Sequence, residues 1–303
     1  MAVTETAATF LGLNNENEFY SGHYLAEVFK GDMAEIIRHW DEHSEQSRAA
    51  VAAGTLSTAV VAPHRALRSM HQAYFALRNN LSTERQVAER IRLQRAFFQD
   101  LLAVLGIDYQ PQNRTLGPDQ DLPLLADVGG KLWVLGALDI SNEGEDPLSL
   151  KPHVAQFVGA GPHATKLTGQ GGKDGKSYYQ LLSELVFRQD EPPRWVLLLS
   201  DRQAVLIDRY KWPQNRLLRF DWEEILGRRD DLTLKATAVL LHRESLVPAQ
   251  GESRLDSLDE NSHKHAFGVS EDLKYALREA IELIGNEAAE QLIDQARDQA
   301  KGI

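Results

Sequence analysis

Residues 195–207 set the architecture of the chain, and they read Trp195-Val196-Leu197-Leu198-Leu199, Ser200-Asp201-Arg202-Gln203, Ala204-Val205-Leu206-Ile207. The first five residues are all apolar, whereas a strand with one face in water alternates apolar and polar residues. We therefore expect a strand buried on both faces, a tight polar turn, and a second strand that returns beside the first. Packing layers on both sides of such a sheet predict an α+β or α/β fold class.

The residues upstream of this pair predict a hairpin, a loop and a helix. Two apolar runs, residues 124–128 and 132–140, are separated by Gly129-Gly130, which is typical of a β-hairpin. The polar, Gly-rich residues 141–176 predict a long loop with one short element around residues 154–158. Residues 177–187 have apolar side chains at helical spacing and predict a helix.

Both ends of the chain have helical periodicity. Residues 14–108 are expected to form helices, and the chain is expected to be helical again from Phe220 onward. The clearest helix is the last one, for which Ser270 is a plausible N-cap. Its apolar residues form a seam that must dock on something: Leu273, Leu277, Ile281, Ile284, Ala288, Leu292 and Ala296. The predicted regions are a helical front end (1–108), a mixed-sheet core (109–220) and a helical C-terminal region (221–303).

Composition excludes several classes of protein. The 303 residues carry 33 Lys and Arg against 44 Asp and Glu, a net charge of −11, which does not fit a protein that coats nucleic acid generically. The absence of Cys excludes disulfides, thiolate metal sites and cysteine nucleophiles. No signal-peptide pattern and no apolar run of about 18 residues is present. We therefore expect a cytoplasmic protein without a membrane partner.

Three local motifs suggest chemistry, and each has a simpler interpretation. His39-Trp40-Asp41-Glu42-His43 fits an H-x-x-E-H zinc pattern, but a solvated helix face is preferred because a third ligand is missing. Gly169 to Ser177 resembles a phosphate loop with one residue too many, so a Gly-rich loop ending at a Ser177 cap is preferred. The polar stretch Ser262-His263-Lys264-His265 is expected to be a loop that leads into the last helix.

The order of predicted elements, helix–strand–strand–loop–helix–strand–strand, resembles the core of PD-(D/E)xK nucleases. That chemistry needs two carboxylates on a divalent metal and a Lys two residues after the second acid. Asp127 suits the first position, but Gly136 and Leu138 occupy the positions of the second acid and the Lys. In a shifted frame Asp139 is the acid and Ser141 replaces the Lys. We therefore expect a nuclease-like scaffold without its catalytic groups, in which Asp127 forms turn hydrogen bonds.

A wider resemblance rests on five stretches of sequence. They are Asn15-Glu16-Asn17-Glu18-Phe19-Tyr20-Ser21-Gly22-His23-Tyr24-Leu25, Pro193-Arg194-Trp195-Val196-Leu197-Leu198, Asp208-Arg209-Tyr210-Lys211-Trp212, Leu258-Asp259-Glu260-Asn261-Ser262-His263-Lys264-His265-Ala266, and Leu283-Ile284-Gly285-Asn286-Glu287. In these stretches the chain is similar to the N-terminal region of large single-chain (type IIG-like) restriction–modification adenine DNA methyltransferases, including DISARM-like phage-defence methylases. The similarity covers about residues 11–287.

The resemblance implies a module that works beside a methyltransferase rather than one that transfers methyl groups. No Asn-Pro pair occurs and no Gly-rich cofactor loop follows a strand, so S-adenosylmethionine would bind only in a methyltransferase domain outside this chain. The expected function is a non-catalytic, nuclease-like module of a restriction–modification or antiviral system that binds DNA or docks a methyltransferase domain or defence-system subunit. The expected DNA contacts are basic side chains: Lys173, Lys176, Arg209, Lys211 and Arg216.

Two alternatives remain open. The first is an active Mg-dependent endonuclease that uses Asp127 and Asp139, with Glu184 as a third acid. The second is a pure assembly scaffold whose partner face is the seam of the last helix. The leading hypothesis itself requires no cofactor in this chain.

Overall fold

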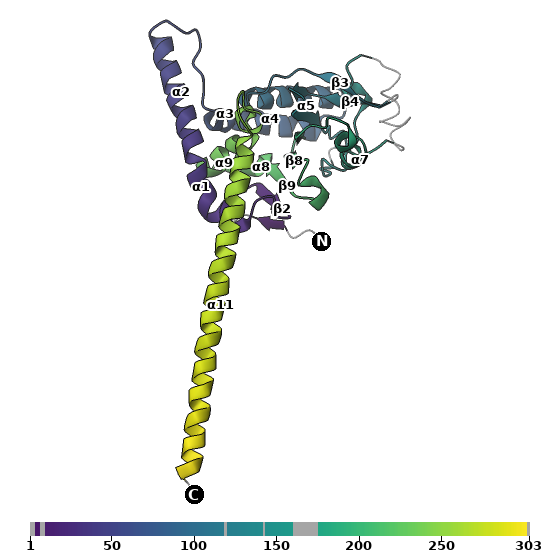
Figure 1. The fold of residues 1–303 in the computed structure, drawn as a ribbon. Helices are drawn as coiled ribbons and strands as arrows, with labels where there is room; N and C mark the ends of the chain where they lie inside the picture. Colours follow the sequence, from purple (N-terminus) through teal and green to yellow (C-terminus); the bar gives the residue numbers. More distant parts are fainter. Residues whose placement is uncertain (1–3, 7–9, 118–119, 142, 160–174, 302–303) are drawn as a thin grey trace.

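The chain folds into an α/β body from which one long helix projects (Figure 1). The computed structural model describes residues 4–6, 10–117, 120–141, 143–159 and 175–301. Among these residues, none of the helices has the length and apolar composition needed to cross a membrane.

The centre of the body is a mixed sheet of seven strands in the order β1-β2-β9-β8-β7-β6-β5. Strands β6 and β7 run parallel, and every other neighbouring pair in the sheet is antiparallel. A separate hairpin pairs β3 with β4. The strands are β1 (Thr4–Thr6), β2 (Leu13–Glu16), β3 (Gln112–Gly117), β4 (Gln120–Leu124), β5 (Ala126–Val128), β6 (Leu132–Gly136), β7 (Trp195–Leu199), β8 (Gln203–Asp208) and β9 (Leu217–Asp221).

Helices and helical turns cover the sheet and connect its strands. The α-helices are α1 (Phe29–Asp32), α2 (Ala34–Ala52), α3 (Pro63–Ser69), α4 (His71–Thr83), α5 (Val87–Val104), α7 (Tyr178–Glu184), α8 (Trp222–Arg228), α9 (Asp231–Leu241), α10 (Arg243–Leu246) and α11 (Arg254–Lys301). A π-helical turn, η1 (Tyr24–Val28), precedes α1. Three 3₁₀ turns are η2 (Val154–Gln156), η3 (Val186–Arg188) and η4 (Trp212–Gln214).

The central strands are buried on both faces, which confirms the prediction made from the apolar run of β7. Along that strand Trp195, Leu197 and Leu199 enter one hydrophobic core, whereas Val196 and Leu198 enter a second core on the opposite face. All five side chains are at most 2% exposed. Each buried large apolar side chain contributes about 1.5–3 kcal/mol, so this strand stabilises the sheet through both of its faces.

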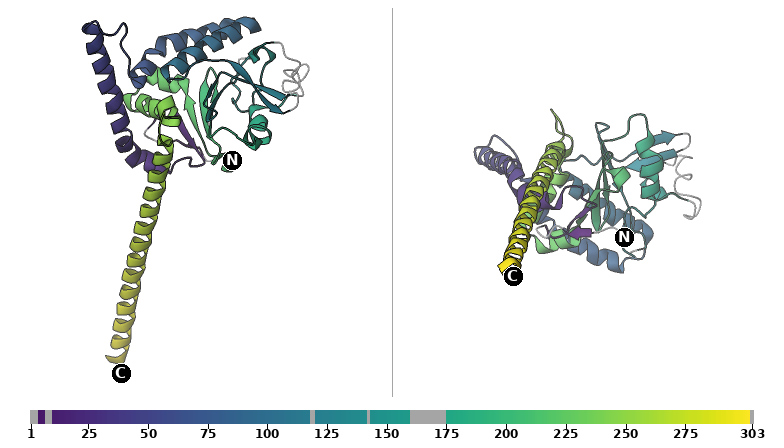
Figure 2. Two further views of the ribbon diagram at one scale, coloured as in Figure 1. Left: turned by 45° about the horizontal axis from the view of Figure 1, so that its top comes forward. Right: turned by 60° about the horizontal axis from the view of Figure 1, so that its bottom comes forward.

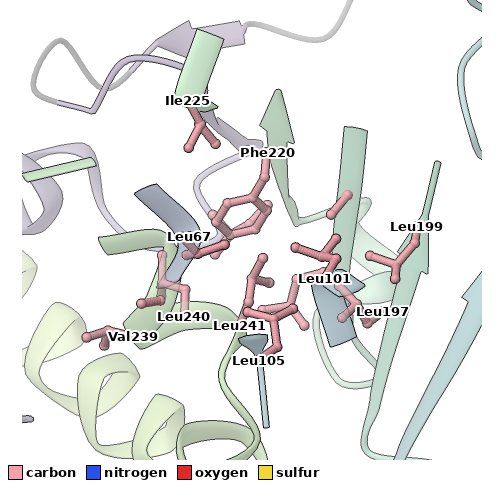
Figure 3. Close-up of a cluster of buried hydrophobic side chains, with 14 of the residues drawn as sticks. Leu67, Leu101, Leu105, Leu197, Leu199, Phe220, Ile225, Val239, Leu240 and Leu241 are labelled. Carbon is pink, nitrogen blue, oxygen red and sulfur yellow. The ribbon is translucent and has the colours of Figure 1, made fainter. Parts of the chain in front are cut away.

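The larger core lies between the sheet and a helical layer. Figure 3 shows part of it, where Leu101 of α5, Leu197 of β7 and Leu240 of α9 gather near Phe220 of β9. The smaller core lies on the other face, where α7 and the β3–β4 hairpin pack against the sheet (Figure 2). The fold is therefore layered, with the parallel pair β6–β7 inside.

The predicted hairpin and the predicted cap are both present. Strands β5 and β6 pair across Gly129 and Gly130, whose φ angles of 59° and 69° lie in the left-handed region that a tight two-residue hairpin turn requires. Ser177 caps α7 in a capping box with Gln180, as the sequence predicts for the helix after the Gly-rich loop. Residues 169–174 of that loop lie outside the described residues.

Two boundaries differ from the expectation of helices at both ends. Residues 13–16 form β2 rather than part of a helical front end, because they pair with β9. Strand β9 extends to Asp221, so the chain turns helical two residues after Phe220, at Trp222. These strands are specified by pairing partners far away in the sequence rather than by local periodicity.

The last helix begins sixteen residues earlier than its predicted N-cap. Helix α11 starts at Arg254, and the hydroxyl of Ser270 donates to the carbonyl oxygen of Ala266 inside the helix, 3.0 Å away. The predicted loop at residues 262–265 is therefore helix as well. The prediction was wrong because the first turns of α11 carry polar residues that bind polar partners in the body, and such residues have the composition of a loop.

Candidate functional site

Asp127 is a turn residue in the β5–β6 hairpin. One carboxylate oxygen, Oδ1, accepts a hydrogen bond from the backbone N–H of Gly130 at 2.8 Å. This contact holds the turn in which Gly129 and Gly130 reverse the chain. The residue opposite Asp127 in the ladder is Trp133, near the start of β6.

Asp139 lies beyond the other end of β6. It follows Trp133 by six positions, and extended chain of that length covers about 20 Å. The Asp139 carboxylate accepts hydrogen bonds from the Ser141 hydroxyl at 3.2 Å and from the Gly144 N–H at 3.1 Å. The structure therefore does not bring Asp127 and Asp139 together.

Glu184 adds no third acid to either position. It lies on α7, and its carboxylate forms an ion pair with Lys176. Across the described ranges of the chain, no group of three or more His, Asp or Glu side chains is arranged to hold a metal ion. His39, Glu42 and His43 are exposed on α2, in agreement with the preferred interpretation of that motif as a solvated face.

Apolar packing fills the two positions where a nuclease needs an acid and a Lys. A Cβ atom on Gly136 would lie 3.2 Å from side-chain atoms of both Phe98 and Leu125, closer than ordinary van der Waals contact. Leu138 is buried in the larger core with 3% of its surface exposed. A charged side chain at either position would displace core residues or lose its hydration.

A second acid, Asp201, accompanies Asp139 at the carboxyl ends of the parallel strands β6 and β7. Asp201 is 1% exposed and forms an ion pair with Arg78 of α4. Burial raises the pKa of Asp201 above its ordinary value; the Arg78 guanidinium opposes this rise, and the nearby Asp139 carboxylate adds to it. The Oδ1 atom of Asp201 has no hydrogen-bond partner among the described residues.

Helix α5 holds the backbone of Asp139 in place. The side-chain amide of Gln94, which is fully buried, accepts from the Asp139 N–H at 2.9 Å and donates to the Asp139 carbonyl oxygen at 3.0 Å. Arg90 donates to the same carbonyl oxygen at 3.3 Å. These contacts fix the chain where it leaves β6, so the two acids sit on a rigid part of the fold.

The feature of the sequence that indicates this acidic pair is the position of each Asp shortly after a strand. Asp201 follows the buried strand β7 by two residues, and side chains just beyond the carboxyl ends of parallel strands meet at one edge of a sheet. Sequence reasoning missed Asp201 because the parallel pairing of β6 with β7 does not follow from either strand alone. Nothing in the local sequence marks Arg78 or Gln94 as a site residue, because the sequence does not show which side of their helices packs against the sheet.

The predicted basic residues that the structure describes differ in their surroundings. Lys211 is 8% exposed, and its ammonium group is bound by Asp259 and by the carbonyl oxygen of Phe19. Desolvation lowers the pKa of Lys211, although the Asp259 carboxylate opposes this shift. Lys176 is paired with Glu184, Arg216 is half-buried, and Lys173 lies outside the described residues.

Arg209 is the predicted basic residue that reaches a cavity. This cavity, of about 430 Å³, lies beside the turn before β6 and the start of β7. Arg209 donates to the Pro192 carbonyl oxygen at 3.0 Å and to the Tyr210 hydroxyl at 2.7 Å. The polar and aromatic side chains that line the cavity are Lys131, Arg194, Trp195, Arg209, Tyr210, Glu252, Ser253 and Asp256. We call it the basic cavity.

One wall of the basic cavity consists of the Arg194 guanidinium and the rings of Trp195 and Tyr210. The Arg194 guanidinium lies 4.7 Å from the ring centroid of Trp195 and 4.2 Å from that of Tyr210. Ion pairs with Asp208 and Asp256 offset the charge of Arg194. Tyr210 is 65% exposed, so its ring remains accessible. This wall can present a planar aromatic surface and the cationic groups of Lys131 and Arg209 to a ligand.

Three of the stretches that carry the family resemblance meet beside this cavity, at the base of α11. The Tyr20 hydroxyl donates to the Leu255 carbonyl oxygen at 3.3 Å, and the Ser21 N–H donates to the Ser262 hydroxyl at 2.9 Å. The ion pair of Lys211 with Asp259 joins the turn after strand β8 to the same helix turns. Residues that are distant in sequence therefore form one polar cluster that anchors α11.

Comparison of the chain with protein-family models, with curated protein sequences and with solved structures gave no significant match.

Proposed function

We propose that this chain is a non-catalytic, nuclease-like module of a restriction–modification or phage-defence DNA methyltransferase system. The observation that carries the proposal is the end of β6 and the residues after it, where Gly136 and Leu138 pack into a core at the positions that an acid and a Lys would occupy. The order α5–β5–β6–α7–β7–β8, with the β3–β4 hairpin inserted after α5 and with β6 parallel to β7, supports a relation to the nuclease scaffold. A module with such a strand acts by binding.

Duplex DNA is the proposed ligand, and the basic cavity is its proposed contact. Lys131 and Arg209 line the cavity and supply cationic groups suited to the phosphate oxygens of a duplex. The net charge of −11 confines favourable contacts with DNA to a local patch. Binding of this kind weakens steeply as salt concentration rises, because phosphate contacts release counterions.

The test is fluorescence anisotropy of a labelled duplex titrated with the full chain at several salt concentrations. The double variant Lys131→Glu/Arg209→Glu is expected to weaken binding at least about tenfold and to flatten the salt dependence. The matched control, Lys264→Glu/Lys274→Glu, makes the same change in net charge on exposed turns of α11 and is expected to bind like the unmodified chain. Equal losses in both variants would contradict a contact at the cavity. No DNA binding by the unmodified chain would leave a methyltransferase domain or defence-system subunit as the partner.

A Mg-dependent endonuclease is the second candidate, and the buried acids Asp139 and Asp201 are the observation that favours it. They lie at the carboxyl ends of β6 and β7, where ligand-binding residues of open α/β sheets gather. Nicking of supercoiled plasmid with Mg²⁺ distinguishes the two candidates. Activity that disappears in Asp139→Asn and Asp201→Asn, but not in the exposed Asp190→Asn control, would replace the binding module by an enzyme.

A further inference from the structure

A second cavity lies where α4 ends and α5 begins, two helices that pack side by side (Figure 1). It measures about 590 Å³, and its polar lining comes from these two helices, their connection and the chain after β6: Ser82, Thr83, Glu84, Arg85, Arg90 and Ser141. The basic cavity lies before the start of β6, whereas this one lies beyond its end. We call it the junction cavity.

Arg90 is a buried cation of the junction cavity that has no acidic partner. Its guanidinium donates to the carbonyl oxygens of Leu81 at 2.6 Å, Glu84 at 3.1 Å and Asp139 at 3.3 Å, so it lies between the end of α4 and the chain after β6. Arg90 is 3% exposed, and among the described residues it forms no ion pair and its Nε–H finds no acceptor. Because a buried charge without a counter-charge is costly, an anion in the cavity would be stabilised by this guanidinium.

A second cation of the junction cavity, Arg85, is available to a ligand. It is exposed, and it makes no ion pair or hydrogen bond within the part of the chain that the structure describes. Its planar guanidinium can therefore turn toward a ligand without first losing an internal contact. Glu84, the acid among the described lining residues, is engaged: its Oε1 atom accepts a hydrogen bond from the Gln86 N–H at 2.6 Å. Positive charge therefore exceeds negative charge here, although the chain as a whole is acidic.

Uncharged donors lie beside the two cations. The side chain of Gln86, the N-cap of α5, makes no capping hydrogen bond, and the N-terminus of this 18-residue helix favours an anion. The hydroxyl groups of Ser82 and Thr83 lie on exposed turns, where they donate to the carbonyl oxygens of Asn79 at 2.7 Å and Asn80 at 3.2 Å. Hydroxyl hydrogens rotate freely, so these groups can donate to a ligand instead. Guanidinium, hydroxyl and helix N–H groups together are the donors that bind oxyanions.

We infer that the junction cavity binds a phosphate group, with Arg85 and Arg90 as its cationic contacts. A phosphate monoester carries about two negative charges at pH 7 and offers three acceptor oxygens, which suits two guanidinium groups better than a carboxylate does. The cavity has the volume of a small-molecule site, so it has room for the rest of a phosphorylated compound. The inference does not depend on the proposed function, because the proposed duplex contact lies at the other end of β6.

Isothermal titration calorimetry of the full chain with inorganic phosphate, at constant ionic strength balanced with chloride, tests the site. The Kd should lie below about 1 mM, and Arg85→Gln should raise it at least about tenfold because a charge-assisted contact is lost. The matched control Arg188→Gln removes an exposed Arg of η3 that does not line the cavity, and it should bind like the unmodified chain. Circular dichroism checks that both variants stay folded. No binding at millimolar phosphate, or equal losses in the two variants, would overturn the inference.

Further titrations identify the source of the phosphate and separate this site from the basic cavity. 5′-AMP should bind at least about tenfold more tightly than adenosine, and equal affinities would overturn the phosphate contact. A duplex that binds more tightly with 5′-phosphates than without them, and loses this preference in Arg85→Gln, would assign the bound phosphate to a DNA end. The double variant Lys131→Glu/Arg209→Glu should bind inorganic phosphate like the unmodified chain. Loss of phosphate binding in that variant would place the phosphate in the basic cavity and overturn the inference.

Discussion

The ammonium group of Lys211 lies between the carboxylate of Asp259 and the carbonyl oxygen of Phe19. It also lies 4.3 Å from the ring centroid of Phe19 and 4.8 Å from that of Tyr20. One side chain just after β8 thereby joins the N-terminal segment to the first turns of α11. The direction in which α11 leaves the body follows from this contact and its neighbours.

Replacement of Lys211 by Met should destabilise the chain by about 2 kcal/mol. The substitution keeps most of the volume but leaves the partly buried Asp259 carboxylate and the Phe19 carbonyl oxygen without their donor. Urea denaturation followed by circular dichroism measures the loss. The matched control is Lys264→Met, which removes an exposed pair with Glu260 and should cost less than about 0.5 kcal/mol. Equal stability of the two variants would show that the anchor does not depend on Lys211.

Gly136→Ala should destabilise the chain by about 1–2 kcal/mol, because the added methyl group meets Phe98 and Leu125 at 3.2 Å. Gly268→Ala is the control, since a Cβ at this position of α11 meets nothing within 4 Å. In the control, helix propensity alone should stabilise the chain by up to about 1 kcal/mol. Thermal or urea unfolding measures both. A neutral Gly136→Ala would mean that the acid position of β6 has room for a side chain.

Asp127→Asn should leave stability unchanged, whereas Asp127→Ala should cost about 1 kcal/mol. The amide oxygen of Asn can accept the hydrogen bond from the Gly130 N–H, and Ala cannot. Urea denaturation of both variants separates a turn role from a role that depends on charge. If Asn were as harmful as Ala, the negative charge of Asp127 rather than its hydrogen bond would be what matters.

Acidification below pH 6.5 should reduce the free energy of unfolding, with His242 as one cause. Burial lowers the pKa of His242 below 6.5, while the Glu244 carboxylate opposes this shift. As the pH is lowered, the unfolded chain therefore takes up a proton near pH 6.5, before the folded chain does. The free energy of unfolding decreases from that point until the pH has passed the pKa of His242 in the folded chain. His242 Nδ1 also accepts a hydrogen bond from the Glu244 N–H at 3.3 Å, which requires that nitrogen to be unprotonated.

Urea titrations at pH 7.5 and 5.5 measure this effect. His242→Asn keeps a side chain that can cap α10 but does not titrate, so it should lose less stability than the unmodified chain on acidification. His263→Asn, at an exposed position on α11, should behave like the unmodified chain. Burial also lowers the pKa of His64, so part of the decline should persist in His242→Asn. An unchanged pH dependence in His242→Asn would exclude a contribution from this ring.

Local sequence predicts the elements whose residues carry their own signal. The apolar run of β7, the double glycine between β5 and β6, and the Ser177 cap each follow from one short stretch. Strand β2, with Leu13 followed by Asn14, Asn15 and Glu16, has no strand signal and forms because β9 lies beside it. Tertiary pairing decides such segments.

The site is less predictable than the fold because its residues contact partners on other elements. Asp127 can be assigned to a turn from its neighbours in the sequence. The burial of Lys211, in contrast, depends on the docking of α11, whose first turns have the polar composition of a loop because of residues such as Asp259 and Ser262. Asp201 becomes a candidate only after β7 is known to lie parallel to β6. Long-range partners therefore determine which charged groups are available for binding.

The proposed function depends on a sheet that lacks the groups needed to bind a divalent cation, and Mn²⁺ binding tests this proposal most directly. Electron paramagnetic resonance of Mn²⁺ mixed with an equimolar amount of the full chain measures the fraction of metal that remains free. We predict that the signal of free Mn²⁺ stays undiminished and is the same for the unmodified chain and for Asp139→Asn. Loss of one equivalent of free metal, restored by Asp139→Asn or Asp127→Asn, would contradict the claim.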